Sequence, residues 1–176
     1  MSLDQSFILH PSCILNYEPN VTERQAITAY LTQVIGGRTA EIQKNLPTSM
    51  SLWGKVHILS GGNAVWSHFA ARLTAQPIQN SSYIQVRVTA SQQYNLPNIG
   101  KTHRLEKILV FSLPDARIWR NLAGRMVVVA LVMPCQTHGK NATQERTSYS
   151  QTLAMIATDL RNIKVVVGCC KTRRNG

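Results

Sequence analysis

The hydrophobic positions before residue 47 repeat with the period of an α-helix. Ile27, Tyr30, Leu31, Val34 and Ile35 fall three or four residues apart and so share one helical face. Thr22 and Gln25 precede them at the spacing of a capping box, and Gly36-Gly37 follows. The pattern predicts one helix that ends at the paired glycines. A shorter helix is predicted over Thr39–Leu46, where Pro47 ends it.

After Pro47 the pattern changes to the alternation of β-strands. Strands are predicted at residues 53–59, 83–89, 105–113, 126–133 and 163–167. Residues 126–133 are apolar at every position, which indicates a strand covered on both faces. For residues 63–72 a helical turn and a strand remain alternatives. We therefore expect an α+β, β-rich fold: a curved antiparallel sheet or small barrel of five to six strands, with two short N-terminal helices.

The length of 176 residues suits a single domain. We expect residues 1–24 to form an N-terminal arm, residues 25–168 the β-rich domain, and residues 169–176 a basic tail. Within the first twenty residues, an arm and a lone strand at Phe7, Ile8 and Leu9 remain alternatives. The first residues do not resemble a secretory leader, and the longest apolar run is about a third of a membrane helix. These features predict an intracellular protein with reduced cysteines and no membrane partner.

The composition adds a strong excess of positive charge. The chain has 19 Lys and Arg against 8 Asp and Glu, a net charge of +11, and residues 42–105 and 116–144 contain no carboxylate. Such a surface favours a polyanion as partner, above all nucleic acid. The predicted phosphate contacts are Lys55, Arg87, Lys101, Arg104, Arg120 and Arg125. Trp53, Trp66, Tyr83 and Tyr94 lie between these cations and are candidates for stacking on bases.

Few residues suit catalysis. Carboxylate-dependent metal nucleases need several converging acids, which are scarce here, and the phosphate-loop and Gly-x-Ser-x-Gly motifs are missing. A nucleophile pair of Cys135 with His57 or His103 stays open, as does a reactive thiol at Cys169-Cys170 beside the basic tail. The composition favours a non-enzymatic protein without deciding the point.

Two Cys/His pairs suggest one possible metal site. His10 with Cys13, and Cys135 with His138, each have three-residue spacing. Brought together, the pairs would form a Cys2His2 zinc site that ties the arm to the end of the apolar strand. The alternative is that the pairs arise by chance and that Cys135 is an ordinary buried thiol. No other cofactor is expected.

Four groups of segments within residues 26–168 carry a resemblance to a known family. They are Leu46-Pro47 with Trp53-Gly54-Lys55-Val56-His57-Ile58 and Gly61-Gly62; residues 104–110 with Leu113-Pro114; residues 129–132 with Cys135; and Asp159-Leu160 with residues 165–168. Together they resemble an uncharacterised, transposon-associated protein family of mushroom-forming (basidiomycete) fungi. The resemblance implies a β-rich domain of mobile-element origin and brings no catalytic residues. Where its members often carry an acid after the paired glycines, this chain has Asn63. The strand order is also loosely similar to bromo-adjacent-homology barrels of chromatin proteins.

Three hypotheses for function follow. The first is a non-enzymatic nucleic-acid-binding module for DNA or chromatin, of mobile-element origin and located in the nucleus, that contacts mainly phosphates. The second is a structural or interaction domain that forms a homo-oligomer or binds an acidic protein, motivated by strand 126–133 and by an exposed edge at strand 105–113. The third is a metal- or cysteine-dependent hydrolase, which requires the two Cys/His pairs to converge.

Overall fold

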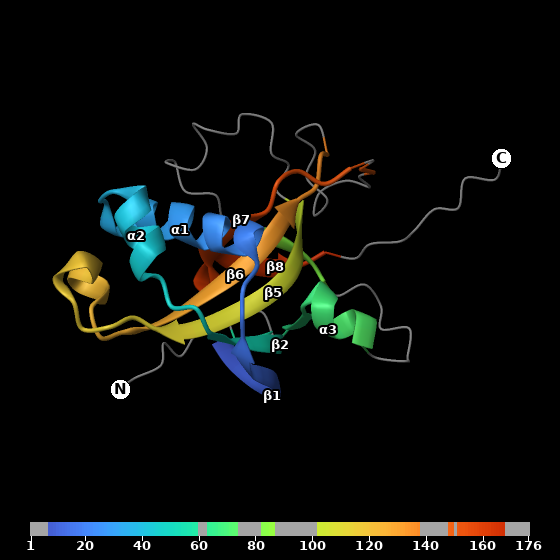
Figure 1. Ribbon diagram of the computed structural model, residues 1–176. Coiled ribbons are helices and arrows are strands. Elements are labelled where there is room, and N and C mark those ends of the chain that lie inside the picture. Colours follow the sequence, from blue (N-terminus) through green and yellow to red (C-terminus); the bar gives the residue numbers. More distant parts are fainter. Residues whose placement is uncertain are drawn as a thin grey trace.

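The computed structural model describes residues 7–59, 63–73, 82–86, 102–137, 148–149 and 151–167, except for the side chains of residues 11–13, 63, 164 and 165. Within these residues eight strands form one sheet, accompanied by three α-helices and two 3-10 segments (Figure 1). In chain order the elements are β1 (Phe7–Tyr17), α1 (Val21–Ile35), α2 (Thr39–Asn45), β2 (Met50–Ile58), β3 (Asn63–Trp66), α3 (His68–Leu73), β4 (Tyr83–Val86), β5 (Thr102–Ser112), η1 (Arg117–Leu122), β6 (Met126–Pro134), β7 (Ile156–Asp159), η2 (Leu160–Asn162) and β8 (Ile163–Val166).

The predicted helical pair is confirmed, with a different N-terminal cap. The side chain of Asn20 accepts the Glu23 amide at 3.0 Å, and the Glu23 carboxylate accepts the Asn20 amide at 3.1 Å. This pair forms the capping box, so the expected box of Thr22 and Gln25 is wrong. Asn20 is the better cap because its short side chain reaches the amide three residues on. The helix ends at Gly36, whose φ of 67° suits glycine.

Strand β5 organises the sheet because it has three partners. One edge pairs with β6 from His103 to Ser112, and the other edge pairs first with β4 and then with β2. Every pairing in the described sheet is antiparallel. The sheet curves and branches at β5 but stays open, so the curved antiparallel sheet is confirmed, and neither the closed barrel nor the count of five to six strands is supported. Since β2 leaves β5 and continues with β3, the strands diverge there.

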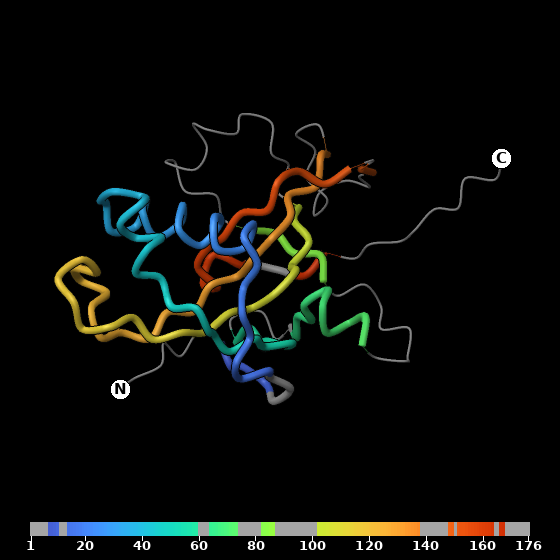
Figure 2. Tube along the Cα trace, in the orientation of Figure 1, coloured from blue at the N-terminus to red at the C-terminus, as the bar shows by residue number. Residues whose placement is uncertain are grey.

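The predicted central strand is covered on both faces. Alternate residues of β6 point to opposite sides. Val129 and Leu131 pack with α1 and α2, whereas Ala130 and Val132 pack in a second cluster with residues of β2, β4 and β8. Figures 1 and 2 show α1 and α2 on one side of the β5–β6 pair. This layering places the α1–α2 connection at the same end of the molecule as the β5–β6 connection.

Several segments differ from the expectation. Residues 7–17, for which an arm or a short lone strand at residues 7–9 was expected, pair with β2 as a longer strand of the sheet, although two register shifts interrupt the pairing. Residues 63–73, left open between helix and strand, contain both β3 and α3. Strand β7 was not predicted, because its four residues are too short to show a period. Among the described residues, no helix has the length and apolar character that crossing a membrane requires.

Candidate polyanion-binding surface

The connection between β5 and β6 is a platform that carries arginines and is anchored in the core. Trp119, in the middle of η1, has 0% exposure and anchors the connection in the core. The Leu113 amide donates to the Arg125 carbonyl at 2.9 Å, which closes the base of the connection. Arg117 and Arg125 are exposed on either side of the buried tryptophan. The platform thus holds positive side chains in solvent on a fixed backbone.

Arg120 links this platform to the end of α1. It is the only non-glycine residue with a positive φ in the described chain, with φ 48° and ψ −120°. Backbone of this kind costs on the order of 1–3 kcal/mol and persists only where surrounding contacts impose it. The guanidinium lies against Gly36, where a β-carbon would come within 3.2 Å of Nη1. Helix α1 has no basic residue in its last turn, so Arg120 supplies the positive charge that favours a helix C-terminus.

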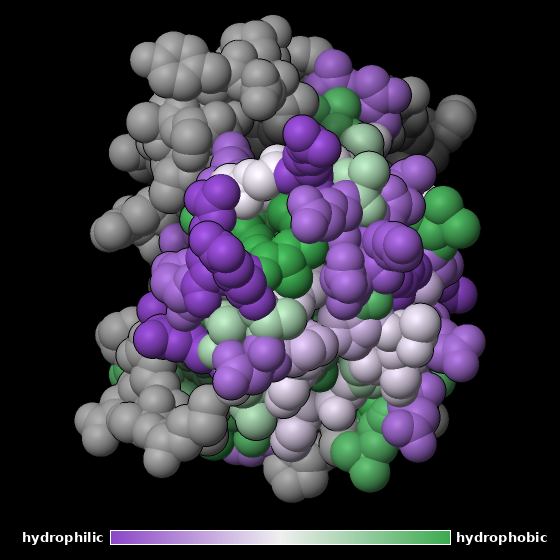
Figure 3. Space-filling view, turned by 60° about the vertical axis from the view of Figure 1, so that its left-hand side comes forward, coloured by the Kyte–Doolittle hydropathy of each residue, from purple (hydrophilic) through white to green (hydrophobic). Residues whose placement is uncertain are grey.

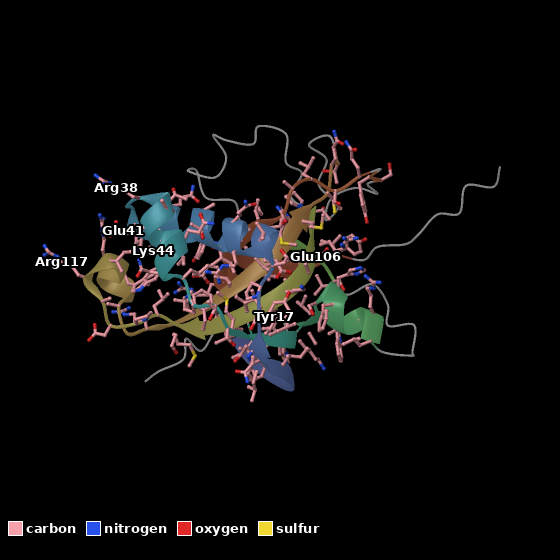
Figure 4. All side chains as sticks on the ribbon, in the orientation of Figure 1. Tyr17, Arg38, Glu41, Lys44, Glu106 and Arg117 are labelled. Atoms are coloured by element: carbon pink, nitrogen blue, oxygen red, sulfur yellow. The ribbon has the colours of Figure 1, made fainter. Side chains whose placement is uncertain are left out.

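Two further cations come from α2 and the residue before it. Arg38 and Lys44 are exposed, and Figure 4 shows them at the same end of the molecule as Arg117, with Glu41 near them. We call the set Arg38, Lys44, Arg117, Arg120 and Arg125 the basic end. Within the described residues no ion pair engages any of the five. The acids Glu41 and Asp115 leave an excess of three positive charges there. Figure 3, turned to bring this side forward, shows hydrophilic side chains grouped around a smaller hydrophobic patch.

Of the six cations predicted from the sequence, the four in the described part of the chain do not share one surface. Arg120 and Arg125 belong to the basic end. Lys55 lies on β2 with its Nζ 4.8 Å from the centre of the Trp66 ring, and Arg104 forms an ion pair with Glu106 on the same strand. The other two predicted contacts, Arg87 and Lys101, lie outside the described residues. The sequence did not single out Arg38 and Lys44. Arg38 lies outside the carboxylate-free intervals, and Lys44, although inside the interval 42–105, comes to the same end as Arg117 only in the folded chain.

The aromatic candidates are poorly placed for base stacking. Trp53 and Trp66 are half-buried and Tyr83 is buried, while Tyr94 lies outside the described residues. Trp53 packs against the second core cluster. The described surface therefore favours contacts to phosphates over stacking of aromatic side chains on bases.

A second group of charged side chains is closed within the protein. Glu23, in the first turn of α1, is 1% exposed; Lys107 Nζ donates to its Oε1 at 2.5 Å and the Tyr17 hydroxyl donates to its Oε2 at 2.7 Å. Lys107 also donates to the Tyr17 hydroxyl at 2.5 Å. Burial lowers the pKa of Lys107, but its hydrogen bonds to Glu23 and Tyr17 raise it more, so the net shift is upward. We call these three residues the Glu23 network; it joins β1, α1 and β5.

The proposed zinc ligands are only partly described. His10 lies on β1 opposite Lys55, and its ring stacks with that of His57 at 6.1 Å between centres. Cys135 follows β6, and the strand order places β2 and β5 between β1 and β6. The side chain of Cys13 and all of His138 lie outside the described residues. The described part of the chain contains no group of three or more potential ligands, and the four-ligand site stays a prediction.

The alternative nucleophile pair of Cys135 with His57 or His103 stays a prediction. His103 lies opposite Pro134 in the β5–β6 register, and the following residue, Cys135, packs with Tyr83 and Val167. Cys169-Cys170 lies outside the described residues.

Comparison with protein-family models, curated proteins and solved structures finds no match to this chain. The resemblance to a transposon-associated family, and the mobile-element origin that it implies, therefore stay predictions.

Proposed function

We propose that the basic end binds nucleic acid through its phosphates and that the protein is a non-enzymatic binding module. One observation carries the proposal: two segments far apart in the sequence meet at Gly36 and Arg120 and bring together five exposed cations that have no ion pair among the described residues. Four of the five are arginines, whose planar guanidinium matches phosphate oxygens in a bidentate manner. An isolated phosphate would need fewer cations, whereas a polymer offers a regular row of negative charges.

DNA or chromatin in the nucleus is the partner that agrees best with the other features. The family resemblance suggests a mobile-element origin, and Lys171-Thr172-Arg173-Arg174 resembles half of a nuclear-import signal. Binding through phosphates alone carries little sequence information. We therefore propose binding that depends weakly on sequence and strongly on salt.

The salt dependence of duplex binding tests the proposal. Each phosphate contact contributes about −0.9 to the slope of log K against log salt, so five contacts give about −4.5. Between about 50 and about 200 mM salt the affinity for a duplex DNA oligonucleotide, measured by fluorescence anisotropy, then falls about 500-fold. Arg117→Gln removes one contact and reduces the magnitude of the slope by about 0.9. Arg72→Gln, an exposed arginine on α3, is the matched control and leaves the slope unchanged.

Three results would contradict the proposal. One is the lack of DNA and RNA binding even at low salt, and another is an equal effect of Arg72→Gln and Arg117→Gln. The third is tighter binding to vesicles containing phosphatidylserine than to any nucleic acid, which would assign the basic end to a membrane surface.

A further inference from the structure

Strand β1 exposes hydrophobic side chains along its length. Ile8 is 49% exposed, Ile14 47% and Leu15 65%. The strand pairs with β2 along one edge, and no other strand in the described chain pairs with it. Within the described residues, its second edge therefore presents backbone donors and acceptors together with apolar side chains, the combination that other strands recognise. The strand expected to have an exposed edge, 105–113, is instead covered by β2, β4 and β6.

The charge distribution indicates which kind of partner pairs with this edge of β1. The eleven residues of β1 include no Lys, Arg, Asp or Glu, in a chain whose net charge is +11. Two copies that meet through their basic surfaces repel each other, whereas two β1 strands bring no like charges together. A nucleic acid or an acidic protein gains no electrostatic attraction from an uncharged strand. The uncharged edge of β1 therefore suits pairing with a second copy of this chain.

The side-chain pattern indicates pairing along the edge and not docking on one face. Ile14 and Leu15 are consecutive, so their side chains point to opposite faces of the strand, and both are exposed. A partner lying on one face would cover only one of them, while a strand added to the edge covers part of each. We infer that β1 pairs with β1 of a second copy and forms a homodimer.

The same strand contains features that limit assembly to two copies. Pro11 has no amide hydrogen to donate, and the register against β2 shifts between His10 and Cys13 and again between Ile14 and Tyr17. These interruptions prevent a long flat ladder of the kind that propagates into fibres. A two-fold contact between identical edges uses the same surface of both copies, so it closes at the dimer.

A charge placed in the edge tests the inference on the full chain. Sedimentation velocity after nuclease treatment, at about 0.5 M NaCl to screen surface charge, is expected to show a monomer–dimer equilibrium that shifts with protein concentration. Leu15→Lys should raise the dissociation constant of the dimer at least tenfold, because pairing would hold the charged ammonium groups of the two copies at the contact. Leu73→Lys, at the end of α3, makes the same change at a residue with 72% exposure and should leave the equilibrium unchanged.

Three outcomes would overturn the inference. They are a monomer at every concentration, a dimer that Leu15→Lys leaves intact, and equal weakening by Leu73→Lys. Both positions are exposed, so neither variant is expected to unfold, and circular dichroism confirms this for each protein. The Arg117→Gln variant should dimerise like the wild type. Loss of nucleic-acid binding and loss of dimerisation are thereby separated.

Discussion

Replacing Lys107 by methionine should destabilise the protein through the charge that it leaves behind. Methionine preserves most of the side-chain volume, so packing changes little. The Glu23 carboxylate, with only 2% of its side chain exposed, then loses its counter-ion at 2.5 Å. A buried carboxylate without a positive partner is costly because the protein interior solvates it far less than water does.

The expected loss can be estimated from the contacts. Removing one partner of a buried ion pair costs about 3–5 kcal/mol. The lysine side chain is 18% exposed, and Glu23 keeps its hydrogen bonds from the Tyr17 hydroxyl and the Asn20 amide. We therefore expect Lys107→Met to lower the free energy of unfolding by about 3 kcal/mol, near the lower end of this range. For a chain of this size that corresponds to a fall in Tm of roughly 6–12 °C.

Urea unfolding followed by circular dichroism measures this loss, and a double-mutant cycle tests its cause. Glu23→Gln combined with Lys107→Met removes both charges, so the double variant should be more stable than Lys107→Met alone. Lys44→Met, an exposed lysine on α2, is the control and should change stability by less than about 0.5 kcal/mol. A loss below about 1 kcal/mol for Lys107→Met, or strictly additive effects in the cycle, would refute the reasoning.

Three further predictions concern stability. Burial raises the pKa of Tyr30 from its ordinary 10.0 to about 12, so the stability that its neutral form contributes is present below pH 10.0 and is lost as the pH rises through about 12. The raised pKa of Lys107 lowers stability at alkaline pH in the same direction. Tyr30→Phe should therefore weaken the dependence of the free energy of unfolding on pH in this range, and an unchanged dependence would contradict the prediction. Gly36→Ala should lower the free energy of unfolding in urea by at least about 1 kcal/mol, because φ of residue 36 is positive and the new methyl group meets the Arg120 guanidinium. An unchanged midpoint of urea unfolding would contradict both the backbone strain and the contact. Leu131→Ala, at a position with 0% exposure, should cost about 2–5 kcal/mol, and a smaller loss would argue against its place in the core.

Local patterns predicted the elements that have a clear period or stop signal. The helix over α1 was recognised from apolar residues three and four apart, and its end from Gly36-Gly37. The alternation of β2 predicted its two faces, and the continuous apolar run of β6 predicted a strand that is buried at most positions. Strand β7 and the full length of β1 were missed because their residues are held by pairing with distant strands and show no strong local pattern.

The amino-acid sequence by itself determined the positive charge, the scarcity of acids and the main helices and strands. It also selected Arg120 and Arg125 as binding candidates. Only the tertiary structure decided which charges are available: it buried Glu23 with Lys107, residues 84 positions apart, and paired Arg104 with Glu106. It also brought Arg120 to Gly36. The physical reason is that electrostatic energy depends on separation and on exposure to water, and neither is set until the chain has folded.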